Sequence, residues 1–255
     1  MRQDDQAPDP GAIESLRLLL QEASAPVAFT GAGISTDAGI PDFRSPGGLW
    51  SQMEPITYQE FCASNSARLE DWRRRFVMNG QFRNADPTIT HLALGDMVLA
   101  GKMPAIITQN IDGLHQRSGV GPDRVVELHG NATYGHCLDC RLPMDLDTVR
   151  ALIDTTRQCP VCPDCGGLVK AAVVSFGESM PEAALSRAAE FCRNADLILV
   201  IGTSLQVQPA ASLPQIGVEC GAGLVIINKQ STPLDGIAEM VLNHSIDSVF
   251  TALSS

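Results

Sequence analysis

Positive charge is scarce in this sequence. Its 255 residues include 18 lysines and arginines against 29 aspartates and glutamates, which gives a net charge of −11 at pH 7. Proteins that track a nucleic-acid backbone gain affinity through clustered lysine and arginine, because these release counterions from phosphates. We therefore expect no direct binding of nucleic acid. The acidic surface either suits basic peptide partners or simply keeps the protein in solution.

Long apolar runs are absent as well. The longest, such as residues 197–201 and 224–227, fall far short of the roughly 20 residues that cross a bilayer. The N-terminal residues MRQDDQAPDPGA are polar and acidic, without the basic start and apolar run of a secretory signal. These features predict a short disordered lead, no membrane contact and a cytoplasmic location.

The pattern along the chain predicts an α/β fold. With 44% hydrophobic and 18% charged residues, the composition is that of a packed globular protein. Helical spacing of apolar residues predicts a helix over 13–21, and short apolar runs predict buried strands at 26–30, 105–108, 197–201 and 224–227. Strands that alternate with helices indicate a Rossmann-type parallel sheet with helices on both faces and ligands at the carboxyl ends of the strands. Two stretches interrupt the alternation: a helix-rich insertion at 45–86 and a cysteine-rich insertion at 131–170.

Small residues follow the first predicted strand. Gly31 and Gly33 begin the segment GAGISTDAGIPDFR, although the third glycine of a full dinucleotide fingerprint is replaced by Thr36. Small residues allow the backbone to approach a ligand closely, and free amides at this turn can face a pyrophosphate. Asp42, Phe43 and Arg44 then offer an acceptor, an apolar lid and a cation on one loop; surface decoration is the alternative.

Polar side chains follow later strands. Gln109, Asn110 and Asp112 suit ribose hydroxyls and a carboxamide, although asparagine and aspartate also cap helices. His129 precedes a glycine and is our candidate for a general base, because imidazole titrates near neutral pH. We interpret the other histidines at 91, 115 and 244 as structural.

Eight cysteines without a secretory signal favour metal binding over disulfides, and a reducing compartment. Two C-x-x-C pairs predict a closed, structural zinc site with four thiolate ligands, namely Cys137, Cys140, Cys162 and Cys165. Cys159 also has ligand spacing relative to Cys162, and His136 is a less favoured substitute. The cysteines at 62, 192 and 220 are expected to be inert core residues.

As an ordered set these motifs resemble the sirtuins, the NAD-dependent protein-lysine deacylases, from about residue 13 to 253. The segments that carry the resemblance are GAGISTDAGIPDFR at 31–44, TQNIDGLH at 108–115, LHG at 128–130, the paired C-x-x-C motifs, VVSFGE at 173–178, GTSL at 202–205 and IINKQ at 226–230. The resemblance implies one catalytic domain spanning 1–255, which removes acetyl or other neutral acyl groups from lysines of proteins or peptides. NAD would be consumed, giving nicotinamide and O-acyl-ADP-ribose, and one zinc ion would be structural.

The resemblance also implies roles for individual residues. His129 and Asn110 would be catalytic. The cofactor would contact Gly31, Ala32, Gly33, Asp42, Phe43, Arg44, Gln109, Asn110, Ile111, Asp112, Gly202, Thr203, Ser204, Asn228 and Ile246. The acyl-lysine peptide would contact Val174, Ser175, Phe176 and Gly177, in a segment expected to be an extended edge to which a peptide adds as a strand.

Departures from the family pattern leave some properties open. Lys170 and Ala171 stand where many sirtuins have an Arg-Pro pair, and Ser175 replaces an aromatic residue, so the resemblance does not define the peptide preference. Arg73 and Phe76 stand where sirtuins that remove acidic acyl groups carry tyrosine and arginine, which disfavours succinyl or malonyl substrates. The arginine cluster at 73–75 is interpreted as a solvated helix face. Transfer of ADP-ribose to protein, and noncatalytic sensing of NAD, are the alternative functions.

Overall fold

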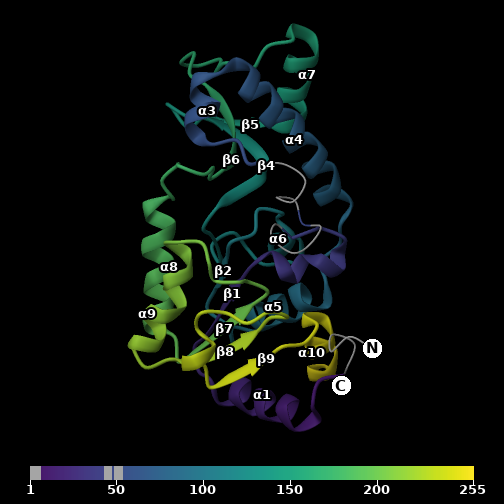
Figure 1. The fold of residues 1–255 in the computed structure, drawn as a ribbon, viewed down its shortest axis with the longest axis vertical. Helices are drawn as coiled ribbons and strands as arrows, with labels where there is room; N and C mark the ends of the chain where they lie inside the picture. The colour runs from purple at the N-terminus through teal and green to yellow at the C-terminus, as the bar shows by residue number, and fades with distance from the viewer. Residues whose placement is uncertain (1–6, 43–47, 49–53) are drawn as a thin grey trace.

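A six-stranded parallel sheet forms the larger part of the molecule (Figure 1). The computed structural model describes residues 7–42, 48 and 54–255. The strands lie in the order β3-β2-β1-β7-β8-β9, and every neighbouring pair is parallel. They are β1 (Pro26–Thr30), β2 (Ile106–Thr108), β3 (Val125–Glu127), β7 (Leu197–Ile201), β8 (Gly223–Ile227) and β9 (Met240–Leu242). The predicted Rossmann-type sheet is confirmed, and β3 and β9 are additions to the four strands expected from the sequence.

Helices cover both faces of this sheet because its central strands bury side chains on each side. Along β7, Leu197 and Leu199 belong to one core cluster and Ile198 and Val200 to the other. The first cluster is completed by α1 (Pro10–Glu22), α5 (Ile89–Leu99) and α10 (Ile246–Leu253). The second is completed by α8 (Glu182–Asn194) and α9 (Leu213–Glu219). Figure 1 shows α8 and α9 together on one side of the sheet.

A smaller part lies at the other end of the molecule (Figure 1). Its antiparallel sheet has the order β5-β4-β6, from β4 (Gly130–Cys137), β5 (Pro143–Asp145) and β6 (Val169–Val173). Three helices accompany it: α3 (Tyr58–Ala63), α4 (Asn65–Asn84) and α7 (Leu146–Thr156). A third core joins α4, α7 and the three strands around the fully buried Trp72. The boundaries predicted for the two insertions, 45–86 and 131–170, remain predictions.

Short elements complete the description. They are η2 (Ala32–Ala38), α6 (Leu114–Arg117), η3 (Ala210–Ser212) and η4 (Asp235–Ile237). Within the described ranges no helix is long and apolar enough to cross a membrane.

Two sequence expectations are wrong. The extended edge expected at 173–178 ends with β6 at Val173, because the Glu178 amide donates to the Ser175 carbonyl and closes a turn with Gly177 at a φ of 79°. Cys220 is exposed rather than buried, since it caps the C-terminus of α9, whereas Cys192 is buried as expected and Cys62 only partly.

Candidate active site

One cleft of about 880 Å³ runs between the carboxyl edge of the parallel sheet and the smaller part of the molecule. In the sheet, β2 lies on one side of β1 and β7 lies on the other side. The cleft therefore lies at the point where the strand order reverses. Of the predicted cofactor residues, those that line this cleft are Gly31, Ala32, Gly33, Asp42, Gln109, Asn110, Ile111, Gly202, Thr203, Ser204, Asn228 and Ile246. A cavity of this size suits a ligand as large as a dinucleotide. Phe43 and Arg44 lie outside the described residues.

The glycines after β1 allow two loops to pack together. A Cβ on Gly33 would lie 2.7 Å from the Cα of Gly202, which is closer than real Cβ contacts. The Gly33 amide donates to the Gly202 carbonyl at 2.8 Å, and the Gly31 amide to that of Ile201 at 3.0 Å. These two amides are therefore not free for a pyrophosphate, because they join the loop after β1 to the loop after β7.

Asn110 and Asp112 lie beside this loop in a buried polar network. The Asn110 amide donates to the Gly31 carbonyl at 3.1 Å and to the Ser35 hydroxyl at 3.2 Å, and Ser35 donates to the Asp112 carboxylate at 2.8 Å. Burial raises the pKa of Asp112. Asp112 lines a second small pocket of about 20 Å³, which adjoins the main cleft at Ala32, Asn110 and Ile111. It also accepts the Leu114 amide at 2.9 Å, so the capping alternative holds in part.

Ser35 is a site residue that the sequence reasoning missed. Ser35 is 1% exposed, and its hydroxyl accepts from the Asn110 amide and donates to the Asp112 carboxylate, two proposed cofactor residues. Its position inside GAGISTDAGIPDFR was the available signal, but a serine in a small-residue run does not reveal its partners before the fold is known.

His129 lies on the cleft wall between β3 and β4. Its Nδ1 is 2.9 Å from the Gln109 carbonyl, which can only accept, so Nδ1 carries the proton and Nε2 of the neutral ring carries none. Gly130 has a φ of 77°, and a Cβ there would collide with the Ala172 carbonyl. The glycine therefore permits the close crossing of β4 and β6 that places this histidine beside the substrate segment.

The predicted peptide residues lie on the cleft wall next to His129. Val174, Ser175, Phe176 and Gly177 all line the cleft. The Val174 amide donates to the His129 carbonyl at 2.9 Å, and the Tyr58 amide at the start of α3 donates to the Phe176 carbonyl at 2.9 Å. The candidate base and the candidate peptide segment are thus directly connected.

Helix α4 contributes charged residues to the same cleft. Arg73 is exposed, as expected, but Arg74 and Arg75 line the cleft with side chains only 23% and 15% exposed, so the interpretation as a solvated face is wrong for these two. Both are paired: Arg74 lies 2.7 Å from Glu70, and Arg75 lies 3.4 Å from Asp71.

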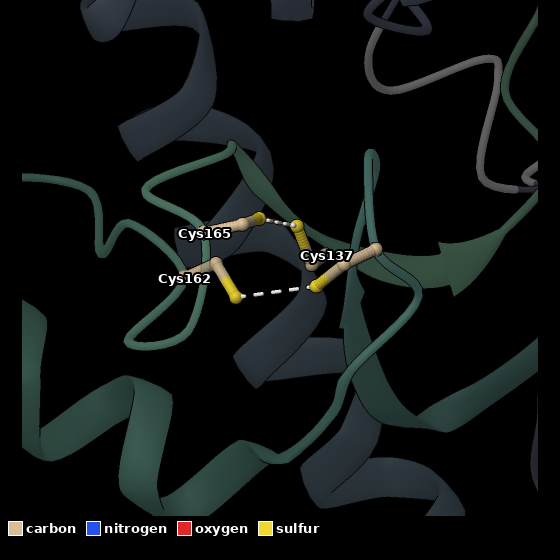
Figure 2. Close-up of side chains that lie close together, drawn as sticks. Cys137, Cys162 and Cys165 are labelled. Atoms are coloured by element: carbon tan, nitrogen blue, oxygen red, sulfur yellow. Dashed lines mark hydrogen bonds between the residues drawn. The ribbon is translucent and has the colours of Figure 1, made fainter.

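Four cysteines converge in the smaller part of the molecule. The thiols of Cys137, Cys140, Cys162 and Cys165 all lie within 4.8 Å of one another, and Cys159 is not among them. Figure 2 shows Cys162 and Cys165 pointing toward the strand end that carries Cys137. Backbone amides, that of Cys140 foremost, lower the pKa of the Cys137 thiol to about 7.

Two similar turns present these thiols. The amide after the second cysteine of each pair donates to the carbonyl of the first: Arg141 to Cys137 at 3.1 Å, and Gly166 to Cys162 at 2.9 Å. Both residues have positive φ, 65° and 78°. A set of four sulfur ligands fits a tetrahedral, structural zinc ion with no open position.

Comparison with known proteins gives consistent matches. A model of the Sir2 family matches residues 31–209. The chain is 53% identical over 234 residues to a protein of Rhodopseudomonas palustris named NAD-dependent protein deacetylase, with 92% of each chain covered. It is 45% identical over 231 residues to one of the same name from Thermodesulfovibrio yellowstonii, with 91% and 90% covered.

Solved structures have a similar fold over nearly the whole length of this chain. A structure described as Sir2 with a p53 peptide and NAD+ is 38% identical with a TM-score of 0.82, covering 94% of this chain and 95% of the other. A structure of Sir2Tm bound to a propionylated peptide is 37% identical with a TM-score of 0.82, with the same coverage.

Proposed function

The chain belongs to the Sir2 family, and we propose that it removes acetyl or other neutral acyl groups from protein lysines in an NAD-dependent reaction with His129 as the general base. The observation that carries this assignment of the base is the setting of His129, which lies in the cleft wall with its Nδ1 proton donated to the Gln109 carbonyl at 2.9 Å. Neutral imidazole with an unprotonated Nε2 can accept a proton near pH 7.

The chain's other residues bind and orient the reactants in this proposal. The loops around Gly33 and Gly202 hold the dinucleotide, while Asn110 and Asp112 define the polar end of the site that receives the nicotinamide and its ribose. NAD, when bound, supplies the ribose carbon that takes up the acyl group and nicotinamide as the leaving group. His129 removes a proton from a ribose hydroxyl, one water molecule is consumed as the lysine amine leaves, and the products are free lysine, nicotinamide and O-acyl-ADP-ribose.

The wall formed by Val174, Ser175 and Phe176 holds the acyl-lysine peptide and delivers the acyl group beside His129. Preference for neutral acyl chains is supported by the pairing of Arg74 with Glu70 and of Arg75 with Asp71, since these arginines already have carboxylate partners. An acidic acyl group would have to displace one of those partners.

The finer statements about partners and location are also proposals. The net charge of −11 supports the absence of direct nucleic-acid binding. None of the eight cysteines, each of which lies within the described ranges, forms a disulfide, which supports a reducing, cytoplasmic setting.

The proposal is tested by incubating the protein with an acetyl-lysine peptide, with and without NAD, and following peptide mass. His129→Ala should abolish turnover and leave NAD affinity within about twofold. Turnover by His129→Ala at the wild-type rate would rule out His129 as the base, and loss of NAD binding in the variant would indicate a structural role instead.

A further inference from the structure

We propose that two buried histidines outside the cleft, His91 and His115, position the general base through an ordered chain of hydrogen bonds. This inference rests on the proposed role of His129. His91 on α5 is 0% exposed, His115 on α6 is 1% exposed, and their ring centroids are 4.9 Å apart. Neither is among the described residues that line the cleft.

The tautomer of His91 follows from one backbone contact. Its Nδ1 lies 3.2 Å from the Thr88 amide, which can only donate. Nδ1 therefore bears no proton, and the proton of the neutral ring is on Nε2. Burial lowers the pKa of His91 to about 4, which keeps the ring neutral near pH 7.

The tautomer of His115 follows from its contact with Thr30. His91 Nε2 and His115 Nδ1 are both buried, and neither has a hydrogen-bond partner among the described residues. Buried polar atoms in folded proteins are nearly always paired. The Thr30 hydroxyl donates its one proton to Thr108 at 2.9 Å, so toward His115 Nε2 it can only accept, and Nδ1 of the neutral His115 ring bears no proton. The proton of His115 is then on Nε2, 2.9 Å from the Thr30 hydroxyl.

The chain continues from Thr30 to the base. Having accepted from His115, the Thr30 hydroxyl donates to the Thr108 hydroxyl at 2.9 Å, and Thr108 also accepts the Asn110 amide at 3.0 Å. These contacts fix the turn whose Gln109 carbonyl accepts the Nδ1 proton of His129. From His115 through Thr30 to Thr108 each donor faces the same way, and the Asn110 amide meets this chain at Thr108 from the other side.

The reverse order fails for a specific reason. If Thr108 donated to Thr30 and Thr30 to His115 Nε2, the proton of His115 would be on Nδ1. Two N–H donors, those of His91 and His115, would then share one buried space without an acceptor, which is costly. The histidine pair therefore sets the direction of the hydroxyl pair, and both histidines are positioning residues.

The first test is independent of catalysis. The protein has five histidines, so ¹⁵N labelling of histidine in the full chain gives few ring signals, which single histidine variants assign. We expect both His91 and His115 at pH 7 to show a protonated Nε2 and an unprotonated Nδ1. A proton on Nδ1 of either ring, or a charged ring, would overturn the inference. Because this readout needs no turnover, it remains decisive even if the proposed deacylase function fails.

The second test separates positioning from a merely structural role. His115→Leu should lower kcat by about 10- to 100-fold, the usual effect of removing a residue that orients a reactive group, with KM for NAD within about twofold. His115→Gln, whose side-chain amide can still donate to Thr30, should recover at least part of kcat. Thr30→Val should reproduce the loss and Thr30→Ser should not, and combining His115→Leu with Thr30→Val should add little, because the chain is already broken. An unchanged kcat in a folded His115→Leu variant would refute the proposed positioning of His129 by this chain of hydrogen bonds.

Discussion

The buried ion pair behind the peptide segment allows a quantitative test of the fold. Lys170 replaces the arginine found in many sirtuins and is 1% exposed, with its ammonium 2.9 Å from the carboxylate of Glu178, which is 18% exposed. The ammonium also contacts the carbonyls of Ala171 and Val173. Burial lowers the pKa of Lys170, and Glu178 opposes that shift.

Glu178→Gln should destabilise the protein because it removes the ion-pair partner of a buried ammonium and leaves only the weaker counter-charge of Asp71. Breaking one partner of such a pair costs about 3 to 5 kcal/mol. The lysine can limit this cost by losing its proton, which requires about 5 kcal/mol at pH 7 for an ordinary lysine pKa. Lys170→Met should cost less, since water can still reach the more exposed carboxylate. The double variant should recover most of the loss, because an apolar side chain then replaces an ion pair.

Denaturant unfolding of the wild type, the two single variants and the double variant measures these free energies directly. Glu178 also accepts the Ser175 amide at 2.9 Å, a bond that a glutamine oxygen can still accept, so the Glu178→Gln variant tests the loss of charge and not the loss of this bond. A cost below about 1 kcal/mol for Glu178→Gln, or a double variant whose loss equals the sum of the single losses, would refute this reasoning.

Three further outcomes are expected. Gly33→Ala should weaken NAD binding about tenfold or more, because a Cβ 2.7 Å from the Gly202 backbone costs about 1 to 3 kcal/mol of overpacking. Gly80→Ala, with nothing within 4 Å of the added Cβ, should instead stabilise α4 by about 0.5 to 1 kcal/mol. Calorimetry measures the NAD affinity, and melting curves measure the stability. The pKa of His91 is about 4 in the folded protein, below its unfolded value, so the unfolded chain binds more protons as the pH falls. The free energy of unfolding should therefore decrease by about 3 kcal/mol between pH 6.5 and 4. An equal decrease in the His91→Gln variant would show that His91 is not its cause. Chelation of zinc should inactivate the enzyme by unfolding the four-cysteine turns, and zinc should restore it; full activity in a protein shown to be metal-free would contradict this.

The sequence predicted the parts of the fold that depend on local pattern. The apolar runs of β1 and β7 are long enough to identify, whereas β3 and β9 have three residues each and pair only because neighbouring strands provide hydrogen bonds. The turn at Ser175 was mistaken for a strand because the apolar residues before it continue the pattern of β6.

For the site, too, the sequence did not predict the contacts between segments that are far apart along the chain. Spacing identified the four zinc cysteines and the motif resemblance indicated His129, but neither reveals that the Gly33 amide is used by the Gly202 carbonyl. Likewise, His91 and His115 are 24 positions apart, and their adjacency follows only from the packing of α5 on α6.

The central claim is most directly tested by the ratio of nicotinamide released to acetyl groups lost, measured in one reaction with an acetyl-lysine peptide and NAD. A ratio of about one, with O-acetyl-ADP-ribose as the third product, is the predicted result. Nicotinamide release without loss of the acetyl group would contradict the account and indicate transfer of ADP-ribose or uncoupled cleavage of NAD.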